Sequence, residues 1–99
     1  MDMFQRRKRR IFLKLKEQGK FKHFNQIDLL TLGQSLIAFH DLLKKISDDS
    51  LLSEIFGSEL DYTALHVADI IDSIDLILSD DYGYLQKIRM KKDVLSVPK

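Results

Sequence analysis

Apolar side chains recur every three or four residues along most of the chain, and regular apolar–polar alternation is almost absent. This spacing gathers apolar side chains on one side of an α-helix, whereas a half-buried β-strand needs an apolar residue at every second position. Proline occurs once, at Pro98, so it interrupts none of the periodic segments. The pattern predicts an all-α fold, a small bundle of about four helices over approximately residues 3–18, 25–46, 58–79 and 84–95, with a short helical turn at 51–56.

The segment 25–46 has the clearest helix start. Asn25 is a favoured N-cap residue, and Asp28 suits the positive end of the helix dipole. An apolar arc of about 140° follows at 100° per residue, formed by Leu29, Leu32, Leu36, Phe39, Leu42, Leu43 and Ile46. Leu30 and Ile37 form a thinner apolar strip on the other side. We expect the wide arc to face the core.

The segment 58–79 is predicted to begin after the turn 51–56 stops at Gly57. Ser58 and Asp61 have the spacing of a capping box. The wide apolar arc of this helix comprises Ala64, Val67, Ile70, Ile71, Ile74, Ile77 and Leu78. Gly33, inside the preceding helix, indicates either a close approach by a neighbour or only a cost in helix stability.

A three-residue repeat of ionisable side chains runs along the segment 58–79, at His66, Asp69, Asp72 and Asp75. Each three-residue step turns a helix by about 300°, so successive members slip by about 60° and spread over half the circumference. Metal ligands must instead converge on one point, and zinc usually takes three or four of them from the protein. The repeat therefore predicts a solvated helix side, and we expect neither a metal nor a cofactor.

Apolar residues also lie among these acids, at Tyr62, Leu65 and Leu76. Secondary strips on both long helices have two explanations. Neighbouring helices cover them inside one bundle, or they form a surface for self-association or a protein partner. The second explanation predicts a partner-binding surface at Tyr62, Leu65, Asp69, Asp72 and Leu76.

Size and composition indicate one small domain over residues 1–99. Apolar residues make up 44% of the chain and charged residues 31%, proportions of an ordinary globular protein. Cysteine is absent, which excludes disulfides and thiolate metal sites. No apolar run reaches the roughly 18 residues of a membrane span, and Lys14 interrupts the apolar run that a signal peptide would need. We therefore expect a cytoplasmic protein.

The net charge of +1 conceals a strong segregation. The N-terminal arm, residues 1–24, carries nine Lys/Arg against two Asp/Glu, a formal charge of +7. Residues 25–83 carry two Lys/Arg against twelve Asp/Glu, a formal charge of −10. Such a layout implies an anionic partner for the arm, or docking of the arm on the acidic middle of its own chain.

The basic arm has the best claim to function. Nucleic acid is the first candidate partner, because each neutralised phosphate releases counterions; the predicted contacts are Arg6, Arg7, Lys8, Arg9, Arg10, Lys14 and Lys16. Phe12, Phe21 and Phe24 are candidates for stacking on bases. A protein is the second candidate. An anionic membrane is disfavoured because the apolar seam of Phe4, Ile11 and Leu15 is narrow.

Motifs for catalysis are missing from the sequence. No glycine-rich phosphate loop or nucleophile elbow occurs, and without cysteine the candidate nucleophiles are ordinary hydroxyls. No helix-turn-helix supports sequence-specific DNA reading. We expect a non-enzymatic regulatory or adaptor protein that binds nucleic acid backbone without sequence specificity. The alternative is an inhibitor or immunity-type helical protein that uses the acidic side of segment 58–79, as a possible homo-oligomer such as a homodimer.

Overall fold

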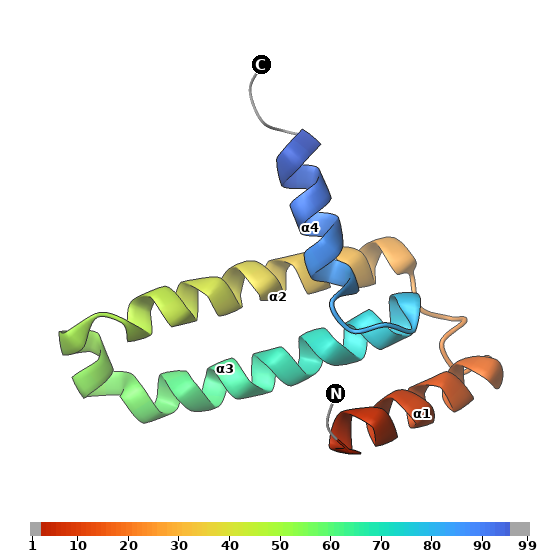
Figure 1. Cartoon of the computed structure of the whole chain (residues 1–99), viewed down its shortest axis with the longest axis horizontal. Coiled ribbons are helices and arrows are strands. Elements are labelled where there is room, and N and C mark those ends of the chain that lie inside the picture. Colours follow the sequence, from red (N-terminus) through yellow and green to blue (C-terminus); the bar gives the residue numbers. More distant parts are fainter. Residues whose placement is uncertain (1–2, 96–99) are drawn as a thin grey trace.

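A computed structural model describes the backbone of residues 3–95 and the side chains of residues 3–89. Throughout this range the chain is all-α and contains no strand, as the apolar spacing predicts. The helices are α1 (Met3–Glu17), α2 (Gln26–Ser47), α3 (Ser50–Ser79) and α4 (Tyr84–Leu95). In Figure 1, α2 and α3 form a long antiparallel hairpin, α1 lies along the C-terminal half of α3, and α4 crosses in front of α2.

Asn25 caps α2 as the sequence predicts. Its side-chain oxygen accepts the backbone N–H groups of Ile27 at 2.9 Å and Asp28 at 3.1 Å. These bonds satisfy N–H groups that the first helical turn otherwise leaves without partners. Gly19, just after the end of α1, has φ +73°, a left-handed conformation that glycine adopts without strain.

The predicted break at Gly57 is wrong, and so is the predicted cap at Ser58. α3 is continuous from Ser50, and Asp49 is its N-cap, accepting the N–H groups of Leu51 and Leu52 at 3.0 Å each. An interior glycine costs a helix only about 1 kcal/mol. A side-chain cap contributes a similar amount, so Gly57 cannot by itself end a helix that is already capped upstream.

The core lies where α2, α3 and α4 meet. Ile37, Ile74 and Leu85 are its most buried members, at 4%, 4% and 0% exposure. Partly buried side chains surround them, namely Leu29, Leu30, Leu36, Ile71 and Leu78. The thin strip of α2 is thus covered by α4, so the explanation in which a neighbouring helix covers the secondary strip is confirmed for α2.

Gly33 is the point of closest approach between α2 and α4. A Cβ atom built on Gly33 would lie 2.5 Å from Cδ1 and 2.8 Å from Cδ2 of Leu85. Carbon atoms pack at about 3.5–4.0 Å, so no larger residue fits while Leu85 keeps its place. Of the two sequence-based explanations for this glycine, the close approach is confirmed.

Candidate functional site

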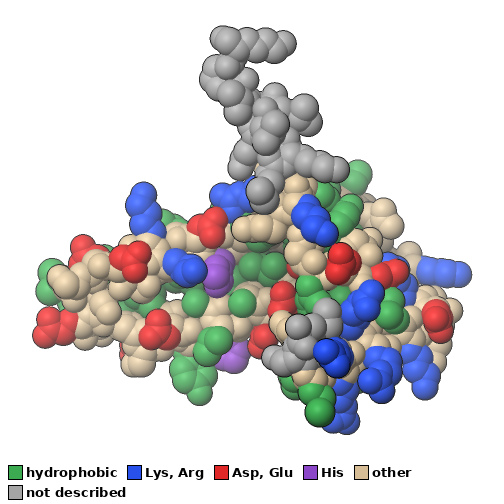
Figure 2. All heavy atoms as spheres, in the orientation of Figure 1, with side chains coloured by type: hydrophobic (Ala, Val, Ile, Leu, Met, Phe, Trp, Pro, Cys, Tyr) green, Lys and Arg blue, Asp and Glu red, His purple; other side chains and the backbone are tan. Residues whose placement is uncertain are grey.

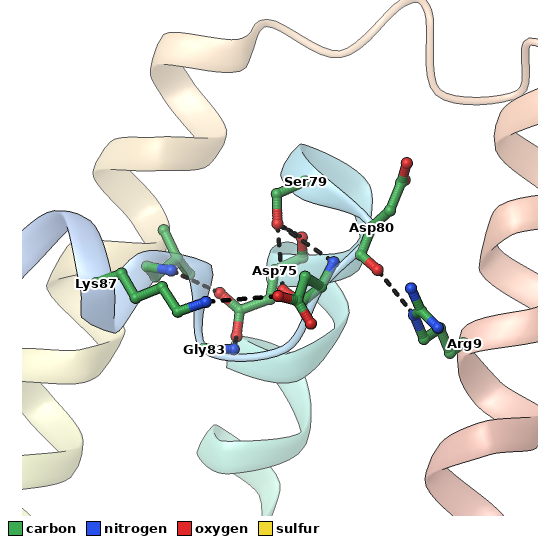
Figure 3. Close-up of polar contacts among 8 residues, drawn as sticks. Arg9, Asp75, Ser79, Asp80, Gly83 and Lys87 are labelled. Carbon is green, nitrogen blue, oxygen red and sulfur yellow. Dashed lines mark hydrogen bonds and ion pairs between the residues drawn. The ribbon is translucent and has the colours of Figure 1, made fainter. Parts of the chain in front are cut away.

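The turn between α3 and α4 joins three helices, as the sticks in Figure 3 show. Asp75 is only 2% exposed, and its two carboxylate oxygens accept the backbone N–H groups of Gly83 and Leu85, each at 2.9 Å. The expectation that Asp75 lies on the solvated side of the helix is therefore wrong. Asp75 instead satisfies N–H groups at the start of α4, a requirement that no periodicity along α3 reveals.

Burial changes the acidity of two aspartates on α3. It raises the pKa of Asp75 above its ordinary value, and the N–H groups of Leu85 and Gly83 oppose the rise. It also raises the pKa of Asp72, with the positive charge of Lys8 opposing the rise. Lys8 therefore lies close enough to interact with the acidic side of α3.

One side of α1 docks on α3 and on the turn that follows it. Lys8 Nζ donates to the carbonyl oxygen of Asp69 at 3.1 Å, and Arg9 Nε donates to that of Asp80 at 2.8 Å. Lys16 forms an ion pair with the Asp80 carboxylate at 2.6 Å. The arm therefore docks partly on its own chain, and this contact uses three of its predicted nucleic-acid contacts.

The other predicted contacts point to solvent. Arg6, Arg7, Arg10 and Lys14 are all exposed. At 100° per residue they span about 100° of α1, on the side away from α3. We call these four residues the cationic face. Within the described side chains, no ion pair joins the cationic face to an Asp or Glu, and in Figure 2 Lys and Arg side chains gather over α1.

Apolar side chains border the cationic face. Phe4 is 72% exposed and Ile11 is 50% exposed, so most of the narrow seam of α1 remains open. A pocket of about 410 Å³ beside them is lined by Phe4, Arg7, Lys8, Ile11, Phe12 and Asp69. Phe12 itself stacks on Phe21 at 5.7 Å between ring centroids. Phe4 is thus the most exposed aromatic side chain among the described residues. The sequence placed Phe4 only in the apolar seam and did not indicate that its ring is open to a ligand.

The predicted partner surface on α3 is only partly exposed. Tyr62 and Leu65 are 67% and 66% exposed, and Asp69 is exposed, whereas Asp72 is half-buried. Leu76 is 1% exposed, so its assignment to a partner surface is wrong. Leu76 follows Asp69 by two helical turns and therefore lies on the side of α3 that α1 covers.

Further observations limit the chemistry of the site. Among the described side chains, no group of three or more His, Asp or Glu residues is placed to hold a metal ion. No helix within residues 3–95 combines the length and apolar character required to cross a membrane.

The sequence matches no protein-family model, and no significant match to a curated protein or to a solved structure was found.

Proposed function

We propose that the protein is a small non-enzymatic regulatory or adaptor protein that binds single-stranded nucleic acid through α1. The observation that carries this proposal is the separation of charges around that helix. Lys8, Arg9 and Lys16 hold α1 on α3 and on the turn after it, while no ion pair joins the cationic face to a carboxylate among the described side chains. Clustered cations gain affinity for phosphates through counterion release and read no base sequence.

The exposed ring of Phe4 supports a single strand as the partner. It lies beside the cationic face, in the pocket that Arg7 and Lys8 also line. A base can stack on such a ring only if it is unpaired, and each stacked base contributes about 1–3 kcal/mol. A phosphate on the same strand would reach Arg7. Duplex DNA offers phosphates but no free base face.

Removing two cations tests the electrostatic part of the proposal. Arg6→Ala with Arg10→Ala is expected to weaken binding to a short single-stranded oligonucleotide by about tenfold. It should also reduce the slope of log affinity against log salt by about 1.4, because two phosphate contacts are lost. Fluorescence polarisation over a salt series measures both quantities.

The matched control removes two exposed cations elsewhere, Lys44→Ala with Lys87→Ala, and should leave the slope nearly unchanged. Phe4→Ala should weaken binding to the single strand more than to a duplex of the same sequence. If the parent protein binds neither oligonucleotide at low salt, or binds only vesicles of anionic phosphatidylserine, the proposal is wrong.

A second candidate function has its own observation in favour. Tyr62 and Leu65 are exposed on α3. Toward the C-terminal end of α3, the same side of the helix contacts α1 through Asp69. We infer that this edge, with Asp69, binds a basic amphipathic helix of a protein partner, because α1 is itself a basic helix with an apolar seam and already packs against the same side of α3.

A labelled peptide with the sequence of residues 3–18 is a suitable probe for this edge. Leu65→Asp is expected to weaken its binding to the full chain at least tenfold, since an apolar contact is replaced by a charge. Ile27→Asp, at an equally exposed apolar position on α2, should not weaken it. Equal affinities for the parent and Leu65→Asp would exclude this second function.

A further inference from the structure

An apolar surface remains uncovered on the side of the hairpin opposite α4. Leu32 and Phe39 of α2 are 48% and 44% exposed, and Phe56 and Ile70 of α3 are 48% and 47% exposed. We call these four residues the apolar face. In helical projection they lie about 100–160° from the positions on their own helix that meet α4, which are Gly33 and Ile37 on α2 and Asp75 on α3. In Figure 1, α4 lies in front of the hairpin, so the apolar face is behind it.

The apolar face is continuous with the core of the hairpin. Leu43 and Val67 are buried between α2 and α3, each at 7% exposure, and belong to the same wide arcs. Leu32, Phe39 and Ile46 also follow one another at intervals of seven residues, the spacing at which one helix packs along another. Both helices therefore present more apolar surface than their mutual contact uses.

Charges border this surface with opposite signs on its two sides. Lys45 lies on the outer edge of α2, and Glu59 lies on α3. Residues of α2 between 40 and 47 line one pocket together with residues of α3 between 60 and 68, so Lys45 and Glu59 lie within about one helical turn of each other along the hairpin. A two-fold axis parallel to the helices would place α2 of one copy over α3 of another. Each Lys45 would then meet Glu59 of the other copy.

We propose that the apolar face is the interface of a homodimer in which two hairpins form a four-helix core. A second copy fits because an isologous interface needs one self-complementary patch. Here that patch is apolar in the middle and has Lys45 and Glu59 at opposite borders. A partner that carries charges of only one sign would be repelled by one of these two borders. The cationic face lies on α1 and stays free, so the dimer does not depend on nucleic-acid binding.

Sedimentation equilibrium of the full chain tests the interface. The parent is expected to be a dimer and Phe39→Asp a monomer with unchanged helical circular dichroism, because a buried carboxylate in the interface has no partner. Ile27→Asp is the matched control, an exposed apolar residue of α2 outside the apolar face, and should remain a dimer. A parent that stays monomeric at every accessible concentration, or a Phe39→Asp variant that dimerises like the parent, would overturn the proposal.

Charge reversal tests the two-fold arrangement without placing a charge in the middle of the interface. Lys45→Glu and Glu59→Lys should each weaken the dimer several-fold, and the double variant should recover most of the loss. If the double variant dissociates as much as the two single changes predict together, this packing of α2 over α3 is wrong. An oligonucleotide titration of the Phe39→Asp monomer keeps the two proposals separate, since binding there supports the cationic face whatever the oligomeric state.

Discussion

Leu85→Ala is expected to lower the free energy of unfolding by about 2–5 kcal/mol, the usual cost of truncating a fully buried leucine. Leu85 is 0% exposed and belongs to the cluster with Ile37 and Ile74. It is also the side chain that meets Gly33, so its loss would leave a cavity between α2 and α4. Urea denaturation followed by circular dichroism measures the change.

Gly33→Ala provides the complementary half of this experiment. In the parent it should cost about 1–3 kcal/mol, because the added methyl overlaps Leu85. In the Leu85→Ala background the same change should become neutral or stabilising by up to about 1 kcal/mol, since alanine is the better helix former. The two substitutions are therefore expected to be strongly non-additive.

Gly57→Ala is the matched control, because its Cβ would meet only Ser53 Oγ, at an ordinary distance of 3.6 Å. We expect Gly57→Ala to stabilise the protein by about 0.5–1 kcal/mol through helix propensity. If Gly33→Ala stabilised the parent in the same way, the result would contradict the close contact between Gly33 of α2 and Leu85 of α4.

Asp75→Asn is expected to cost about 1–3 kcal/mol. Both carboxylate oxygens of Asp75 accept N–H groups, whereas asparagine has one acceptor oxygen, so one buried N–H would lose its partner. Asp69→Asn is the control on the same helix. The side chain of Asp69 is exposed and should change stability by less than about 0.5 kcal/mol. Equal effects of the two substitutions would contradict a capping role for Asp75.

The same variant reveals the pH dependence of this carboxyl group. Burial raises the pKa of Asp75 in the folded state, so the folded protein holds the proton more tightly than the unfolded chain. The contribution to stability is full below the unfolded value of about 3.9 and is lost as pH rises through the folded pKa. The stability difference between the parent and Asp75→Asn should therefore shrink from pH 4 to pH 7. A difference that grew over this range would show that the two N–H bonds lower the pKa of Asp75 more than burial raises it.

Local signals in the sequence located most of the helices. Asn25 and its following turn were sufficient to place the start of α2, and Gly19 was sufficient to place the end of α1. α4 also begins and ends where its pattern predicts. The error at Gly57 came from treating a residue that merely weakens a helix as one that ends it.

The partition of side chains between core and surface was less predictable. Periodicity describes one helix at a time, whereas Ile37 and Leu76 are buried because α4 and α1 cover them. The direction of the cations on α1 depends in the same way on how that helix docks. The run from Arg6 to Arg10 goes around the whole helix, so sequence alone could not separate the docking residues from the cationic face.

The placement of the core also has a consequence for local stability. The cluster of Ile37, Ile74 and Leu85 lies where α4 packs on the hairpin, while the connection between α2 and α3 lies at the end of the hairpin away from α1 and α4 (Figure 1). Fraying of the hairpin from that far end would break few buried contacts and leave the docked α1 in place. We therefore expect α2 and α3 to open locally near their connection while the part of the protein that contains α1 and α4 stays folded.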